Sequence, residues 1–267
     1  MDLHDYDDVA ADYDYYLRVL APGHDSEKVE FHLELARQYG QQGVADIACG
    51  TGAVLIPLIE AGCRVVGVDL SAAMLGVLRG KLEKLPRKVS SRTELICANM
   101  KDLRLEQPVS LAVIPGSGFM HLPTAEDQEE ALRRINHCLM EEGVFSFNTF
   151  DPDYRLIADN AKGSQPESAL RNTFLNARGN QVELWETTEF DPARQLIEGT
   201  WRFRELDEQG AVIDERERPL TMRWSFEAEL RHLLRLCGFE VVELYSSYKK
   251  DPRQYGGWIV WVARKKA

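Results

Sequence analysis

The stretch VADIACGTGAVLIPLIEAG, residues 44–62, decides how this chain folds. It begins as an apolar run typical of a strand, passes through the turn Cys49-Gly50-Thr51-Gly52, and continues with the pattern of an apolar helix. Glycines at such a turn let the backbone bend sharply and let a ligand approach without meeting a Cβ atom. The stretch therefore predicts a strand–turn–helix unit with a ligand lying against its bare backbone.

Short apolar runs alternate with helical patterns in the first half of the chain. Runs rich in Val, Ile, Leu and Phe predict strands at 44–48, 64–70, 93–98, 110–115 and 144–150. Ser71 is placed to cap the helix after the second run, and Thr124 with Asp127 forms a capping pattern for a helix over 125–141. Gly143 should end that helix. This order predicts a doubly wound, mostly parallel sheet of the Rossmann-like α/β class.

The pattern changes after about residue 155, where apolar and polar residues begin to alternate. Residues 161–168 are loop-like, and the segments that follow are separated by turns at DPAR and DEQG. This alternation favours an antiparallel β meander with one wet face, inserted at 165–224. Ser225 should cap a further helix, and two last strands complete a seven-stranded sheet whose final strand is antiparallel. We therefore expect one domain built from 1–160 and 225–267.

Composition narrows the class of protein. The 267 residues carry 32 Lys and Arg against 43 Asp and Glu, a formal charge of −11, which argues against nucleic acid as the partner. No apolar run approaches the roughly 20 residues that cross a bilayer, and the acidic N-terminus lacks the apolar segment of a signal peptide. The cysteines are scattered without CxxC spacing: Cys49, Cys63, Cys97, Cys138 and Cys237. We expect a cytoplasmic protein with reduced thiols, no membrane partner and no zinc site.

Two ligand classes fit a glycine turn of this kind. A dinucleotide fold requires G-x-G-x-x-G, of which Gly50 and Gly52 supply the first two positions, but Leu55 occupies the third. This substitution weakens the case for an NAD-dependent oxidoreductase, which stays as a lesser alternative. Asp69 ends the second predicted strand, where a carboxylate can accept hydrogen bonds from both ribose hydroxyls of any adenosine ligand.

The segment DIACGTG, residues 46–52, resembles the first motif of the class I S-adenosylmethionine (SAM)-dependent methyltransferases, although many relatives carry a glycine where this chain has Ala48. The resemblance covers residues 44–150 well. Upstream, YDDVAADYD at 6–14 matches the Y-D-x-x-A-x-x-Y-D pattern of many small-molecule methyltransferases. The resemblance implies that this N-terminal segment forms a helical lid over SAM and substrate. An ordinary amphipathic helix is the alternative.

Further matches stand at the ends of the next strands. The resemblance places Asn99 and Met100 near the adenine and the segment 113–122, VIPGSGFMHL, beside the sulfonium and the methyl group. It implies SAM as the cofactor and S-adenosylhomocysteine as its product. The residues implied in cofactor binding are Tyr13, Asp46, Ala48, Gly50, Gly52, Asp69, Leu70, Asn99, Met100 and Pro115.

Methyl transfer needs alignment of the two reactants and, for a hydroxyl or ammonium acceptor, a base. His121 follows the fourth predicted strand and is our first candidate for that base, with a backbone-bonded structural histidine as the alternative. Tyr13 is the second candidate. The residues expected to contact the acceptor are Tyr16, Phe119, Met120, Trp201 and Tyr255.

Absent motifs narrow the substrate. The segment after the fourth strand reads IPGSG, without the [DNS]-P-P-[YFW] motif of amino-directed DNA methyltransferases or the Pro-Cys of cytosine-C5 enzymes. Residues 113–122 contain no carboxylate, so we predict no metal. The position of the meander resembles the glycine N-methyltransferase and amino-sugar N,N-dimethyltransferase groups, in which an insertion roofs the acceptor site or joins subunits. Five of its side chains either line such a roof or only pack: Trp185, Trp201, Phe203, Met222 and Trp224.

We therefore predict SAM-dependent methyl transfer to a nitrogen or oxygen of a small-molecule metabolite, with a homodimer through the meander left open. The alternative from a different class is a non-catalytic SAM- or S-adenosylhomocysteine-binding module that uses the meander as a docking surface. The N-terminal motif and the candidate base argue against that alternative.

Overall fold

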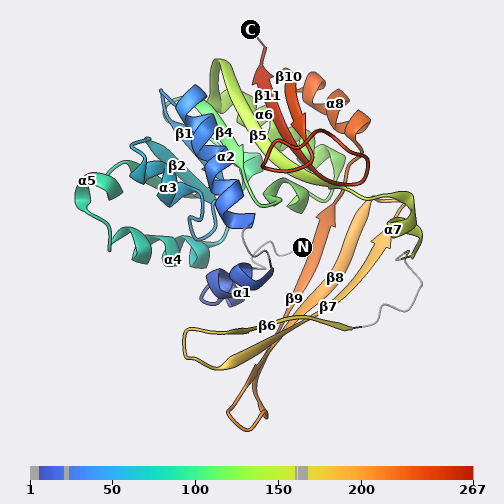
Figure 1. Cartoon of the computed structure of the whole chain (residues 1–267). Coiled ribbons are helices and arrows are strands. Elements are labelled where there is room, and N and C mark those ends of the chain that lie inside the picture. Colours follow the sequence, from blue (N-terminus) through green and yellow to red (C-terminus); the bar gives the residue numbers. More distant parts are fainter. Residues whose placement is uncertain (1–5, 21–23, 160, 162–167, 267) are drawn as a thin grey trace.

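Two β-sheets organise the chain, and the computed structural model describes residues 6–20, 24–159, 161 and 168–266. Figure 1 shows the larger sheet above the smaller one. The larger sheet consists of β1 (Val44–Ile47), β2 (Val65–Asp69), β3 (Thr93–Cys97), β4 (Val109–Ile114), β5 (Leu139–Asp151), β10 (Phe239–Tyr245) and β11 (Gly257–Lys265). Its strand order is β10-β11-β5-β4-β1-β2-β3.

Strand directions in the larger sheet follow the predicted pattern. Strand β1 is parallel to β2 and β4, and β3 and β5 extend the parallel arrangement on either side. Strand β11 runs antiparallel to both of its neighbours, β5 and β10. The predicted fold class, a seven-stranded Rossmann-like sheet with an antiparallel last strand and an inserted meander, is confirmed.

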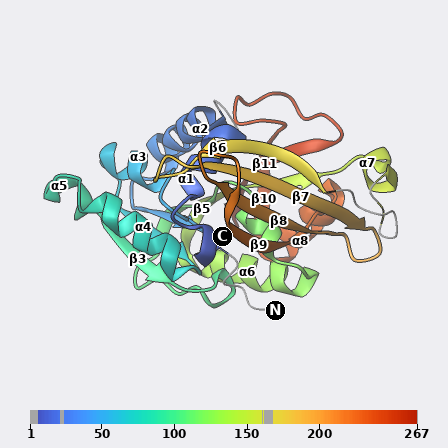
Figure 2. The same ribbon diagram turned by 90° about the horizontal axis from the view of Figure 1, so that it is seen from below.

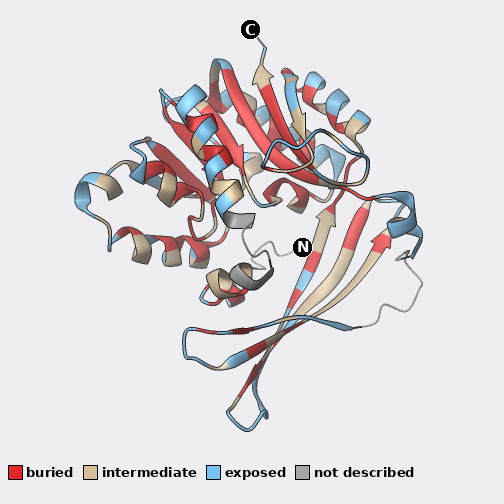
Figure 3. Ribbon diagram, in the orientation of Figure 1, coloured by how far each residue is buried: buried red, intermediate tan, exposed pale blue. Residues whose placement is uncertain are grey.

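Helices cover both faces of this sheet. Strand residues alternate between the faces: Val44 packs with α2 (His24–Tyr39), α3 (Leu55–Glu60) and α4 (Ala72–Leu82), whereas Ala45 packs with α6 (Ala125–Cys138) and α8 (Glu227–Leu236). Figure 2 shows α2 and α3 on one side and α6 and α8 on the other, and Figure 3 shows how much of the strands is buried. The remaining helical elements are η1 (Asp7–Val9), α1 (Tyr13–Leu20), α5 (Arg87–Ser90), η2 (Met100–Asp102), η3 (Gly118–His121) and α7 (Tyr154–Asp159).

Two of the three predicted N-caps are right, and the third is wrong, as is the predicted end of α6. The Ser71 hydroxyl accepts a hydrogen bond from the Met74 backbone N–H at 3.0 Å, and Thr124 caps α6 in the same way. Helix α6 ends at Cys138 rather than at Gly143, because β5 begins directly after it. Ser225 does not cap α8: Phe226 holds the N-cap position, and the Ser225 hydroxyl accepts from Arg223 instead.

The smaller sheet is the predicted meander of β6 (Ala169–Leu175), β7 (Gln181–Asp191), β8 (Leu196–Leu206) and β9 (Val212–Arg223), all antiparallel. One face buries Val182, Leu184 and Phe203 against Tyr16 and other residues of the N-terminal segment. The other face carries ion pairs such as Arg202–Glu217 and Arg204–Glu183. Most of the predicted loop, residues 162–167, lies outside the described residues.

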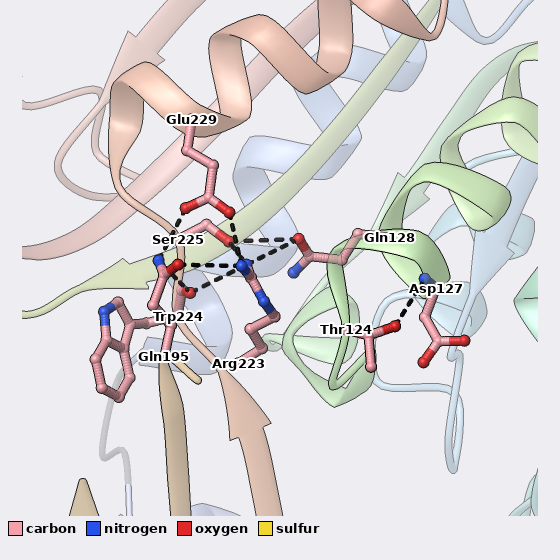
Figure 4. Close-up of polar contacts among 8 residues, drawn as sticks. All are labelled: Thr124, Asp127, Gln128, Gln195, Arg223, Trp224, Ser225 and Glu229. Atoms are coloured by element: carbon pink, nitrogen blue, oxygen red, sulfur yellow. Dashed lines mark hydrogen bonds and ion pairs between the residues drawn. The ribbon is translucent and has the colours of Figure 1, made fainter. Parts of the chain in front are cut away.

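Arg223 joins the meander to the helices of the larger sheet, as Figure 4 shows. Its guanidinium is buried and donates to Ser225 Oγ at 2.7 Å, to Glu229 Oε1 on α8 at 2.8 Å and to Gln195 Oε1 beside β8 at 3.1 Å. A longer contact of 3.3 Å reaches Gln128 on α6. This cluster, which we call the Arg223 hub, fixes one end of the meander.

In the described part of the chain, none of the helices has both the length and the apolar character needed to cross a membrane.

Candidate active site

A cavity of about 350 Å³ lies at the carboxyl ends of the parallel strands, where open α/β sheets bind their ligands. The turns after β1, β2, β3 and β4 form its floor and walls, the N-terminal segment covers it, and β9 contributes Thr221. Its volume is within the range of small-molecule and cofactor sites. The predicted cofactor residues that line it are Tyr13, Ala48, Gly50, Asp69, Leu70, Asn99, Met100 and Pro115.

The two glycines of the β1 turn have different roles. Both adopt positive φ values, +54° at Gly50 and +86° at Gly52, which favour glycine. A Cβ on Gly50 would meet only Tyr13 Cε1, at 3.9 Å, so its backbone is open to the cavity. A Cβ on Gly52 would lie 2.4 Å from Leu78 Cδ1 on α4, and Gly52 does not line the cavity. Gly50 therefore provides the bare backbone, and Gly52 lets the turn pack on α4.

Asp69 carries the carboxylate to which the backbone of the β1 turn is hydrogen-bonded. Its Oδ2 accepts from the Gly50 backbone N–H at 2.7 Å, and its Oδ1 accepts from the Ser71 N–H at 2.9 Å. Burial raises the pKa of this carboxyl, and backbone hydrogen bonds from Ser71, Gly50 and Leu70 oppose that shift. Since a carboxylate has about four acceptor positions, the backbone does not use all of them, and ligand hydroxyls can take the rest.

Asp46 lies in β1 behind the turn and does not line the cavity. It is fully buried, and burial together with the nearby charge of Asp69 raises its pKa to about 8. The carboxyl is therefore largely protonated at neutral pH. The structure does not bring Asp46 or Gly52 to the cavity surface, in contrast to the other predicted cofactor residues.

The N-terminal segment lies over the cavity and is fastened to its rim. Thr51 Oγ1 donates to Asp14 Oδ1 at 2.6 Å, and Lys81 Nζ on α4 pairs with Asp14 Oδ2 at 2.6 Å. The Ser71 hydroxyl donates to Asp7 in the same segment. Tyr13 lines the cavity, and burial raises the pKa of its phenol, which is therefore neutral.

His121 lines the cavity at the end of η3, with its Nε2 3.0 Å from the hydroxyl of Tyr6. Burial and the charge of Arg218 lower its pKa to about 4, and a hydrogen bond to the Thr221 backbone opposes that shift. The imidazole is therefore neutral at physiological pH. The geometry is consistent with both interpretations of His121. The side chain lines the cavity, as expected for a base, and it is also hydrogen-bonded to backbone, as expected for a structural histidine.

The predicted acceptor contacts do not line the cavity. In a 3₁₀ turn, residues three apart share a face, so Gly118 and His121 point to the cavity while Phe119 and Met120 enter the core. Tyr16 is buried among aromatic side chains of the meander, and Tyr255 is 63% exposed. The five aromatic and apolar meander residues also lie outside the cavity lining: Trp185, Trp201, Phe203, Met222 and Trp224.

Several cavity residues were not among the predicted site residues. Tyr6 stands in the N-terminal motif, which could have indicated it beside Tyr13. Thr221 reaches the cavity from β9, and Lys28 from α2. Neither has a local sequence signal, because only the tertiary fold brings these elements to the strand ends.

Comparison with known proteins agrees with this geometry. The profile of a family described as "Methyltransferase domain" matches residues 44–143. The cypemycin N-terminal methyltransferase of Streptomyces sp is 27% identical over 255 residues, which are 92% of this chain and 91% of that protein. A putative methyltransferase, YqeM, of Bacillus subtilis (strain 168) is 30% identical over 206 residues, 74% of this chain and 73% of the relative.

A solved S-adenosylmethionine-dependent methyltransferase from Clostridium acetobutylicum ATCC 824 has the same fold. It superposes with a TM-score of 0.76 at 18% identity, covering 98% of this chain and 99% of the other. Glycine/sarcosine N-methyltransferases and a sugar N-methyltransferase are among the further matches.

Proposed function

Because this chain belongs to the SAM-dependent methyltransferases, we propose that it methylates a nitrogen or oxygen atom of a small-molecule metabolite. The observation that carries the proposal is the contact between Gly50 and Asp69 at the cavity: a bare backbone turn bonded to a carboxylate with acceptor positions left over. Such a carboxylate suits the ribose of an adenosine ligand.

The residues around this contact fit SAM. Leu70 and Met100 offer apolar surface beside Asp69, and Asn99 offers a side-chain amide that its bond to the Lys101 N–H holds in place. SAM supplies a methyl group on a positively charged sulfur, a good leaving group. The chain must then mainly align the acceptor and exclude water, and alignment of this kind corresponds to effective molarities of roughly 10⁵ M or more.

His121 and Tyr13 have distinct parts in the proposal. The neutral imidazole of His121 can accept a hydrogen bond from an acceptor N–H or O–H, in the position that the Tyr6 hydroxyl holds here. Its lowered pKa makes it a weak proton acceptor, so an amine acceptor would react from its neutral form. Tyr13, with a neutral phenol, would donate a hydrogen bond at the cavity.

Nitrogen is the favoured attacking atom. The named activities of several relatives are N-methylations: of the cypemycin N-terminus, of glycine and sarcosine, and of a sugar. These names support an amine acceptor here. A metal-free site and a homodimer through the meander are further parts of the proposal.

Labelled SAM and two acceptor panels, small amines and small alcohols, test this function. We expect label transfer to at least one amine, unaffected by EDTA, and binding of SAM and S-adenosylhomocysteine in preference to NADH. Tight SAM binding without transfer to any acceptor would favour the non-catalytic binding module instead. A preference for NADH would overturn the assignment of the cavity.

A further inference from the structure

Arg218 is a buried cation whose charge has no anionic partner among the described residues. Its side chain on β9 is 2% exposed, and neither Nε nor Nη1 makes a hydrogen bond to a described residue. Trp201, its cross-strand neighbour on β8, likewise has a buried indole Nε1 without a hydrogen-bond partner in the described part of the chain. Three N–H-bearing atoms are thus left unsatisfied side by side.

Aromatic rings surround this guanidinium. Its central carbon lies 3.5 Å from the ring centroid of Tyr6 and 5.0 Å from that of Trp201. Cation–π contacts of this kind stabilise a cation but do not satisfy its N–H donors, which lie in the guanidinium plane. A buried charge without a counter-ion is costly. The neighbouring arginines avoid this cost, since Arg216 pairs with Asp12 at 2.9 Å and Arg223 pairs with Glu229.

Arg218 lies near the part of the cavity that holds His121, the residue proposed to contact the methyl acceptor. Tyr6, which it stacks on, lines the cavity and is bonded to His121. The charge of Arg218 adds to the effect of burial in lowering the pKa of His121, and it opposes the rise that burial causes in the pKa of Tyr13. Asp69 and the residues proposed to contact adenine, Asn99 and Met100, lie at the ends of β2 and β3. Arg218 and Tyr6 instead lie beside the turn after β4, which carries His121.

We propose that Arg218 and the indole N–H of Trp201 bind an anionic group, a carboxylate or a phosphate, that the methyl acceptor carries. The proposal rests on the proposed function and specifies its substrate class as an anionic amine. Tyr6 stands between Arg218 and the cavity on the same N-terminal segment that covers the site. The anionic group therefore reaches the guanidinium when this segment opens and is enclosed when it closes.

Nuclear magnetic resonance tests the anion site without turnover. In ¹⁵N-labelled protein saturated with S-adenosylhomocysteine, the Trp201 indole signal is identified by its loss in Trp201→Phe. We expect acetate or inorganic phosphate to shift this signal saturably, whereas neutral acetamide leaves it in place. The shift should disappear in Arg218→Gln and persist in the control Arg202→Gln, which removes an exposed arginine from the same sheet. No shift with either anion, or an unchanged response in Arg218→Gln, would overturn the proposal.

Kinetics with matched acceptor pairs test the substrate class. Each amine is offered with and without the anionic group, as amino acids against their amides and amino sugar phosphates against amino sugars. The wild type should prefer the anionic members by roughly 10- to 100-fold in kcat/KM, the scale of a hydrogen bond to a charged group. Arg218→Gln should remove most of this preference through KM, and Arg218→Lys should retain part of it. Circular dichroism confirms that the variants fold.

The outcomes separate this inference from the proposed function. If the wild type methylates neutral amines as well as anionic ones, the function stands and the anion site is wrong. If it methylates no amine, the proposed acceptor class fails, and the resonance experiment still decides the anion site. If Arg218→Gln weakens binding of SAM itself more than twofold, the guanidinium holds the cofactor carboxylate and our assignment to the acceptor is overturned.

Discussion

The backbone nitrogen of Gly50 lies 2.7 Å from Oδ2 of Asp69, which joins the turn after β1 to the carboxylate after β2. The same carboxylate accepts from Ser71 at the start of α4. Asp69 therefore orients the bare backbone of the turn as well as offering acceptors of its own. A substitution there should affect the cofactor site more than the fold, because the carboxylate lies at the cavity and outside the hydrophobic core.

Asp69→Ala should weaken SAM binding by about 1.5–3 kcal/mol, the scale of hydrogen bonds to a charged group. Isothermal titration calorimetry measures this loss directly. Asp207→Ala is a suitable control, because Asp207 also accepts backbone N–H bonds but lies in the hairpin between β8 and β9. Unchanged SAM affinity in Asp69→Ala would mean that the ribose lies elsewhere.

Gly52→Ala and Gly50→Ala should have different effects. At Gly52 a methyl group meets Leu78 and a strained backbone, so we expect a loss of about 1–3 kcal/mol in unfolding free energy. At Gly50 the methyl group enters the cavity, so we expect about 1 kcal/mol of lost stability and a larger loss of SAM affinity. Urea unfolding and calorimetry on both variants check the contrast. Equal effects on stability and affinity would contradict these roles.

Asp14→Asn should loosen the N-terminal segment over the cavity. It removes the ion pair with Lys81 and weakens the bond from Thr51. The pair is partly exposed, so we expect about 1 kcal/mol, seen as a several-fold faster release of SAM that diminishes at high salt. Stopped-flow dissociation measures this rate, with Glu30→Gln, which breaks an exposed pair on α2, as the control. Identical release rates in Asp14→Asn and wild type would show that this contact does not retain the cofactor.

His121 should not titrate between pH 6 and 8, because its pKa lies at about 4. A rise in rate across that range would report deprotonation of the acceptor amine. The sign for stability follows from the lowered pKa: between pH 6.5 and 4 the unfolded chain binds a proton that the folded chain does not. The contribution of neutral His121 to the free energy of unfolding is therefore complete above pH 6.5 and is lost as the pH falls toward 4.

His121→Ala should slow turnover by roughly 10²- to 10⁴-fold if His121 engages the acceptor proton, with SAM affinity nearly unchanged. The variant should also lose less stability than the wild type between pH 6.5 and 4. Single-turnover rates and urea unfolding at several pH values measure the two effects. A wild-type rate in the variant would leave His121 with a structural role only.

Local signals explain what the sequence predicts well. Ser71 and Thr124 cap helices because a hydroxyl and a backbone N–H three residues later meet wherever a helix begins. The glycine turn and Asp69 follow adjacent strands, so the parallel sheet brings them together. These relationships require only the strand order, which the alternating pattern predicts.

Non-local relationships account for what the sequence does not predict. Tyr6 and His121 are 115 residues apart and meet only because the N-terminal segment folds over the turn after β4. Phe119 and Met120 look like substrate contacts in sequence, but the 3₁₀ turn directs them inward. Arg218 resembles its neighbours in a charged strand, and only its register opposite Trp201 distinguishes it.

The Arg223 hub limits how the meander can be exchanged between related enzymes. A chimaera that grafts a foreign meander cut between β9 and α8 would separate this guanidinium from Glu229 and Gln128, its partners on the recipient helices. A functional graft therefore has to carry residue 195 and the segment 223–229 together with a matching side chain at position 128. Engineering of acceptor range is simpler in the N-terminal segment, where the part-exposed contacts of Asp14 with Lys81 and Thr51 can be tuned by single substitutions.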